Sequence, residues 1–174
     1  FASAGRRLPW LILLLIIGMM TASLVGYFEQ TIEKVAVLTF FMPMIAGMTG
    51  NTGTQSLALV IRGLTSGQLT RDKYWQILRQ EGLAGIIIST VCSLLIVGMI
   101  LLWRQDLYLG LVVGSSLWFT LLIGTLAGTI IPILLQLLKI DPAVASGPLI
   151  TTLNDVFSLL IYFGIATLFL NHLL

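Results

Sequence analysis

Apolar residues dominate five stretches of the chain, and each stretch is long enough to cross a lipid bilayer as a helix. A membrane-spanning helix needs about 20 predominantly apolar residues. The pattern predicts spans at about residues 9–28, 33–64, 82–103, 107–138 and 144–170. The fold class that follows is an all-α integral membrane domain with five transmembrane helices per chain.

The connection at residues 65–81 is predicted to lie on the cytoplasmic side and to contain a short interfacial helix. Tyr74, Trp75 and Leu78 fall near one helical face, with basic residues elsewhere. This arrangement is typical of a helix that lies in the membrane–water interface. Thr70 is the expected N-cap of that helix. A simple polar loop is the alternative.

The distribution of positive charge predicts the orientation of the chain. Cytoplasmic connections carry an excess of Lys and Arg in membrane proteins. One set of connections and flanks holds most of these residues: Arg6, Arg7, Arg62, Arg71, Lys73, Arg79 and Lys139. The opposite set holds only Lys34 and Arg104. We therefore expect a multi-pass protein of the cell (inner) membrane. Its N-terminus would be cytoplasmic and, after five crossings, its C-terminus would lie on the outer side.

Composition supports a membrane domain and excludes several function classes. Of the 174 residues, 57% are hydrophobic and 9% are charged, whereas soluble domains average about 25% charged residues. The single cysteine, Cys92, excludes an intrachain disulfide framework. The sequence has no nucleophile–base pair, phosphate-binding loop or zinc motif, so we predict no enzyme. Nothing in it indicates a nucleic-acid partner.

Asp155 lies about midway along the fifth stretch, where an ionised side chain is costly. A carboxylate at the centre of a bilayer costs about 2.5–3.5 kcal/mol on insertion scales. No Lys or Arg lies deep enough in any span to pair with it, so it either meets a cation or carries a proton. Thr151, Asp155, Ser158 and Tyr162 form one polar stripe on a helix, and Asn154 is adjacent. The alternative is a protonated Asp155 that donates a hydrogen bond to a neighbouring helix.

The second stretch has one face that is small or polar in an otherwise apolar helix. Residues within about 60° of Gly47 on a helical wheel are Gly50, Asn51, Thr54 and Ala58. Pro43, one turn earlier, removes a backbone donor and frees a carbonyl. Backbone carbonyls near the glycines, with the oxygens of Asn51 and Thr54, could then face water and ions. Close helix packing through small residues is the alternative interpretation.

Carboxylate, amide and hydroxyl oxygens are hard ligands that suit magnesium, calcium or manganese. Magnesium dehydrates reluctantly, so a pore selective for it would contact the waters of the ion. A single carboxylate per chain offers too little negative charge for a divalent cation pore formed within one chain. A homodimer would bring two copies of Asp155 to its two-fold axis, where two carboxylates balance one divalent ion.

Three segments resemble a known family. The segment PMIAGMTGNTGTQS (residues 43–56) resembles the second transmembrane helix of the MgtE family of magnesium channels, and DPAVASGPLITTLND (residues 141–155) resembles the family's fifth helix. The run FEQTIE (residues 28–33) is similar to the first extracellular loop of that family. The resemblance covers essentially the whole chain, and it is limited to the transmembrane domain of the family.

The resemblance implies a homodimer whose pore lies on the two-fold axis between the second and fifth helices. Asp155 matches the pore acid, which binds hydrated magnesium from both subunits. Backbone carbonyls at Gly47, Gly50 and Thr151 would contribute to the ion site. Thr54 stands where some members have Asn, and Ala58 where some have Thr. The expected metal-site residues are therefore Asp155, Gly47, Gly50, Thr151 and Thr54, and the expected pore-lining residues are Asn51, Ala58, Asn154, Ser158 and Pro43.

The resemblance also implies that the longer protein carries cytoplasmic N-terminal and CBS domains. Residues 1–8 would then be the tail of a linker helix, and residues 1–174 the transmembrane domain. Family members close their pore when magnesium binds the cytoplasmic domains.

Three functions are compatible with these patterns. The leading hypothesis is a magnesium-selective channel that passes the hydrated ion through a dimer-axis pore. The second is a divalent cation exchanger coupled to protons or sodium, in which Asp155 alternates between proton and metal. The third is a membrane anchor or assembly module without transport.

Overall fold

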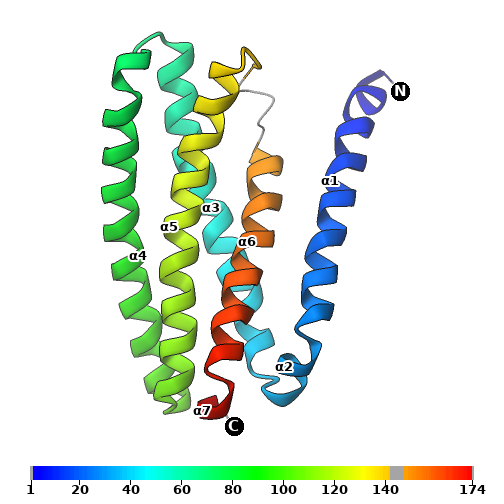
Figure 1. Ribbon diagram of the computed structural model, residues 1–174, viewed down its shortest axis with the longest axis vertical. Helices are drawn as coiled ribbons and strands as arrows, with labels where there is room; N and C mark the ends of the chain where they lie inside the picture. The colour runs from blue at the N-terminus through cyan, green and yellow to red at the C-terminus, as the bar shows by residue number, and fades with distance from the viewer. Residues whose placement is uncertain (1, 142–146, 174) are drawn as a thin grey trace.

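The helices run up and down in an antiparallel bundle (Figure 1). The computed structural model describes residues 2–141 and 147–173, and every regular element in these residues is helical. The prediction of an all-α fold is therefore confirmed. The elements are α1 (Ala2–Tyr27), α2 (Glu29–Lys34), α3 (Leu38–Thr65), the 3-10 turn η1 (Arg71–Lys73), α4 (Tyr74–Arg104), α5 (Leu107–Leu137), α6 (Gly147–Leu168) and α7 (Leu170–Leu173).

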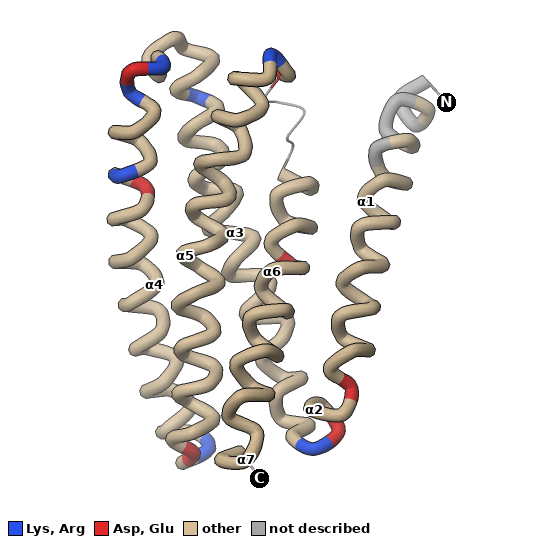
Figure 2. Tube along the Cα trace, viewed as in Figure 1, with Lys and Arg blue, Asp and Glu red and all other residues tan. Residues whose placement is uncertain are grey.

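Helices α3, α4, α5 and α6 form the packed body of the bundle. Helix α3 packs against both α5 and α6, α4 packs against α5, and α1 packs against α6 at the side of the bundle (Figure 1). The first described residues and the last ones lie at opposite ends of the bundle (Figure 1). Most charged positions lie toward the two ends, whereas a basic and an acidic position lie partway along α4 and an acidic position lies partway along α6 (Figure 2).

Three helices of the described part of the chain are long and apolar enough to cross a membrane by length and composition: Arg71–Arg104, Leu107–Leu137 and Gly147–Leu168. Among the described residues, the apolar segment of α1, Leu11–Tyr27, is shorter than these three helices. Helix α3 has 28 residues and is about 42 Å long, but Asn51, Gln55 and several glycines lower its mean hydropathy. The chain is a multi-pass membrane protein, and five crossings remain a prediction.

Two boundaries differ from the sequence prediction. The second span begins at Leu38 rather than at residue 33, because residues 29–34 form the separate helix α2 and the chain turns at Val35. The expected interfacial helix in residues 65–81 is not a separate element. Thr70 is extended and precedes the 3-10 turn η1, and the helix from Tyr74 onward is the beginning of α4. Residues 144–146 of the predicted fifth span lie outside the described residues.

Glycines bring the backbones of α3 and α5 into direct contact. A Cβ atom added to Gly124 would lie 2.8 Å from the carbonyl oxygen of Thr49, and one added to Gly128 would overlap the carbonyl of Gly53. No side chain larger than hydrogen fits at these two positions without moving the backbone. Small residues at such interfaces allow close helix packing in membranes, where lipid gives little hydrophobic drive for association.

We expect Gly128→Ala to destabilise the bundle, because its methyl group would collide with the backbone of α3. Overpacking of this kind costs about 1–3 kcal/mol, so thermal unfolding in detergent should shift to lower temperature. The matched control is Gly98→Ala, because a Cβ atom at Gly98 has no neighbour within 4 Å. Equal unfolding temperatures for the two variants would contradict the close-packed interface.

Candidate functional site

A continuous line of α3 residues is left uncovered by the rest of the chain. Gly47, Asn51, Gln55 and Ala58 are exposed, and Thr54 beside them is half-buried. Pro43, one turn before Gly47, is also exposed. A Cβ atom added to Gly47 would have no neighbour within 4 Å, so the helix faces open space there. These residues lie three or four positions apart and therefore share one helix face.

Helix α6 continues this surface. Gly147, Thr151 and Asp155 are spaced by four residues, so they lie above one another on α6. A Cβ atom added to Gly147 would lie 3.7 Å from Cγ2 of Thr54, so these two residues are neighbours. In the same way, the side chain of Thr151 covers Gly50. We call the exposed or half-buried set the polar strip: Pro43, Gly47, Asn51, Thr54, Gln55, Ala58, Thr151 and Asp155.

The antiparallel register of α3 and α6 determines which α3 residues lie level with Asp155. Thr54 contacts Gly147, and Gly50 contacts Thr151. A step of four residues toward the N-terminus of α3 therefore corresponds to a step of four residues toward the C-terminus of α6. A register within one residue of this one holds at the far end, where the Tyr162 hydroxyl donates to the Leu38 carbonyl at 2.8 Å. One further turn from the Gly50–Thr151 contact therefore brings Asp155 level with Ala46 and Gly47.

The Asp155 carboxylate has no protein partner within the described part of the chain. It is half-buried, and its side chain makes no hydrogen bond or ion pair with the groups that the structure describes. Those residues also contain no cluster of three or more His, Cys, Asp or Glu side chains that could hold a bare metal ion. The strip therefore offers one isolated negative charge rather than a protein cage.

The two threonines of the strip direct their hydroxyl protons into the helix backbone. Thr54 Oγ1 donates to the carbonyls of Gly50 at 3.0 Å and Asn51 at 2.9 Å, and Thr151 Oγ1 donates to the Gly147 carbonyl at 2.6 Å. A hydroxyl oxygen that has donated its proton keeps lone pairs for an incoming donor. Both side chains can therefore accept hydrogen bonds from water.

Four predicted site residues lie off or at the edge of the open surface. Asn154 and Ser158 are fully buried, and Gly50 is buried beneath Thr151. The Nδ2 of Asn154 donates to the Thr49 carbonyl at 3.4 Å, and its Oδ1 has no partner within the described residues. These contacts join α6 to α3. Pro43 is exposed at the end of the strip nearest α2, so its lining role, like that of the buried residues, stays a prediction.

The structure adds residues that the sequence analysis did not assign. Gln55 is exposed on the strip, and Gly53 packs against Asn154. Ser56, on the other side of α3, donates to Glu81 of α4 at 2.6 Å. The four-residue spacing of Gly124 and Gly128 was the available signal for close packing, but spacing alone does not identify the partner helix.

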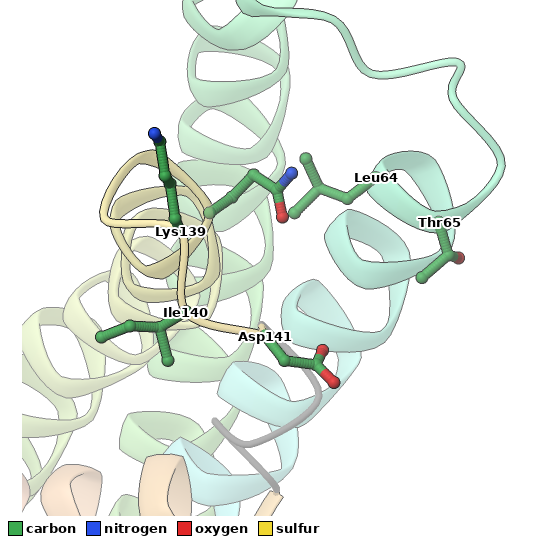
Figure 3. A pocket seen from close by; sticks show the side chains of 6 residues that line it. Leu64, Thr65, Lys139, Ile140 and Asp141 are labelled. Carbon is green, nitrogen blue, oxygen red and sulfur yellow. The ribbon is translucent and has the colours of Figure 1, made fainter.

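A separate recess of about 480 Å³ lies where α3 and α5 end (Figure 3). Leu64 and Thr65 lie on one side, and Gln136 and residues 139–141 on the other. Its lining mixes a cation, a carboxylate and apolar side chains, and it contains no residue of the polar strip.

Comparison with known proteins gives a consistent result. Residues 42–165 match the model of the MgtE family, described as divalent cation transporters. The chain is similar to three proteins named magnesium transporter MgtE: 56% identical to one from Bacillus subtilis, 41% to one from Enterococcus faecalis and 38% to one from Thermus thermophilus. The matches cover 99%, 98% and 95% of this chain. They cover only 38%, 38% and 36% of those relatives.

The register of α3 and α6 can be tested by a disulfide. A Cβ atom built on Gly50 lies 3.8 Å from the Cβ of Thr151, which is about the mean Cβ separation in disulfides. In a Cys92→Ser background, Gly50→Cys with Thr151→Cys should oxidise to an intrachain crosslink, detected by mass spectrometry. Gly47→Cys with Thr151→Cys is the control and should stay reduced. Crosslinking of the control pair alone would contradict the register.

Proposed function

Because this chain belongs to the MgtE family of divalent cation transporters, we propose that it forms the membrane pathway of a magnesium-selective channel. The observation that most supports this proposal is the isolated Asp155 carboxylate on the exposed polar strip. The family match agrees with the prediction that the chain serves transport rather than catalysis. The chain spans less than two fifths of the length of the relatives it matches, so the proposal concerns the membrane pathway.

An unpaired carboxylate at this depth favours a passing cation. An ionised side chain within a membrane is stabilised by a partner of opposite charge or by water. No cationic side chain among the described residues pairs with Asp155. A divalent cation supplies the missing charge, whereas an anion would be repelled.

The remaining groups of the strip suit an ion that keeps its water shell. A hydrated Mg²⁺ presents water protons to its surroundings, so its site must consist of hydrogen-bond acceptors. The strip offers the Asp155 carboxylate, the Thr54 and Thr151 hydroxyl oxygens and the amide oxygen of Asn51. The carbonyl of Gly47 is the proposed backbone acceptor at the level of Asp155. The backbone carbonyls of Gly50 and Thr151 would be further hydrogen-bond acceptors of the site.

A second copy of the chain is the proposed cover of the polar strip. Polar and ionisable groups within the membrane normally face a bundle interior or a water-filled cavity rather than lipid. A two-fold axis beside α3 and α6 would turn two strips toward each other. The pore would then be lined by α3 and α6 of both subunits, with two Asp155 carboxylates facing one divalent ion.

The proposed topology has five crossings, formed by α1, α3, α4, α5 and α6. Their alternating directions in the bundle fit this assignment (Figure 1). The end of the bundle that holds the α3–α4 and α5–α6 connections carries Arg62, Arg71, Lys73 and Lys139, and we assign it to the cytoplasm. The additional length of the relatives is compatible with cytoplasmic N-terminal and CBS domains in the longer protein, which would regulate the pore.

We expect Asp155→Asn to reduce magnesium flux into liposomes by about tenfold or more. Loss of a hydrogen bond to a charged group costs about 1.5–3 kcal/mol, and each 1.4 kcal/mol corresponds to a factor of ten. Glu33→Gln is the matched control, because Glu33 is an exposed acid outside the strip. Selective flux in Asp155→Asn at the wild-type rate would refute the assignment.

Recording internal pH in the same liposomes separates a channel from an exchanger. A channel should show magnesium influx with no fixed proton stoichiometry, with the membrane potential as the driving force. A constant proton-to-magnesium ratio, or a strict requirement for a sodium gradient, would replace the channel by the exchanger.

Magnesium should raise the thermal unfolding temperature of the wild-type protein, because a ligand that binds the native state stabilises it. The increase should rise with magnesium concentration and be smaller in Asp155→Asn. Calcium and manganese titrations rank the ions. An unfolding temperature that is independent of all three ions would favour a structural anchor without an ion site.

A further inference from the structure

The beginning of α4 carries a recess on its outward side, away from the polar strip. It has a volume of about 330 Å³ and is lined by Asp72, Trp75, Gln76, Arg79, Gln80 and Leu83. These residues follow at intervals of three or one and run along one side of the helix. Trp75 is 67% exposed and Leu83 is 59% exposed, so the rest of the chain does not cover the recess.

The recess contains two opposite charges that do not pair with each other. Asp72 and Arg79 both line it, yet neither forms an ion pair with any residue the structure describes. Seven residues separate them, which is about 10 Å along the helix axis. Helical side chains lean toward the N-terminus, so we expect the Arg79 side chain to extend toward Asp72 across the gap between the two charges.

Other groups near the recess already interact within the chain. The pKa of Asp72 is lowered, chiefly by a hydrogen bond from the Thr70 side chain and also by the positive charge of Lys73. Lys73 also donates to the Gln68 carbonyl in the connecting loop at 3.3 Å. Glu81 accepts from Ser56 on the inner side of α4. The amide groups of Gln76 and Gln80 flank the gap and can donate or accept hydrogen bonds.

The length of α4 places this recess at the level of the lipid headgroups. The helix has 31 residues and is about 46 Å long, whereas the hydrocarbon core of a bilayer is about 30 Å thick. Trp75 and Trp103 are about 42 Å apart along α4, close to the thickness of a bilayer with its headgroups. Tryptophans at both ends of a helix are typical anchors at the two interfaces.

We propose that the recess binds the headgroup of a phosphatidylethanolamine-type lipid from the adjacent leaflet. The phosphate lies against Arg79, whose guanidinium can donate two parallel hydrogen bonds to it. The primary ammonium lies farther from the membrane, against Asp72. The two amides hydrogen-bond the phosphate, and Trp75 and Leu83 contact the glycerol and the beginning of an acyl chain.

The chemistry of the recess discriminates between headgroups. A choline headgroup has a phosphate for Arg79, but its quaternary ammonium has no N–H to donate to Asp72. A phosphatidylglycerol headgroup has no cation, so its net negative charge meets the Asp72 carboxylate unfavourably. Binding should therefore be tightest for ethanolamine lipid.

Lipid binding can be measured by native mass spectrometry of the protein in mixed micelles containing phosphatidylethanolamine, phosphatidylcholine or phosphatidylglycerol of equal chain length. We expect the wild-type protein to retain phosphatidylethanolamine at least about threefold better than phosphatidylcholine. Arg79→Gln should lower retention of all three lipids, by about tenfold for phosphatidylethanolamine. Asp72→Asn should abolish the preference over phosphatidylcholine while leaving phosphatidylcholine binding unchanged.

Matched controls are Arg104→Gln at the other end of α4 and Glu33→Gln in α2, which should behave as wild type. Equal retention of the three lipids by wild type, or a preference unaffected by Asp72→Asn, would overturn the proposal. Soluble phosphoethanolamine should not compete at millimolar concentration, because it lacks the acyl contact with Trp75 and Leu83. Full competition would instead assign the recess to a soluble phosphoamine. The readout is lipid retention, so it does not depend on magnesium transport.

Discussion

Helix α3 lies so close to α5 and α6 that this packing determines which of its sides stays open. Gly128 and Gly124 admit α3 on one side, and Gly50 and Gly53 admit α6 on the other. The backbone contacts fix both the depth and the rotation of α3. With these sides buried, the Gly47 side of the helix is the one left uncovered, and the half-buried Asp155 is held level with it.

Buried polar contacts set the register that the glycines permit. Tyr162 bonds the carbonyl of Leu38 near one end of α3, and Asn154 bonds the carbonyl of Thr49 at its middle. Hydrogen bonds between membrane helices contribute about 0.6 kcal/mol on average, so their value here is positional. They prevent α6 from sliding along α3, which would move Asp155 away from the level of Gly47.

Periodicity and composition predict the all-helical fold well, because membrane helices need long apolar runs, whereas the number of crossings stays a prediction. The single carboxylate in the fifth apolar run was equally visible, since an unpartnered charge there is rare. The helical wheel was less informative about individual residues. Gly47 and Gly50 lie on the same broad face, yet Gly47 is open and Gly50 is covered by Thr151. Asn154 is next to Asp155 in sequence but points into the packed interior, which only the partner helices determine.

The low mean hydropathy of α3 has a consequence for how the chain enters the membrane during synthesis. A segment that contains Asn51, Gln55 and several glycines partitions weakly into lipid on its own. It becomes stable there once Gly124 and Gly128 of α5 pack against its backbone and α6 covers Gly50. Integration of α3 should therefore be completed only after the C-terminal half of the domain has been made, and its helix-helix contacts act as a late assembly step.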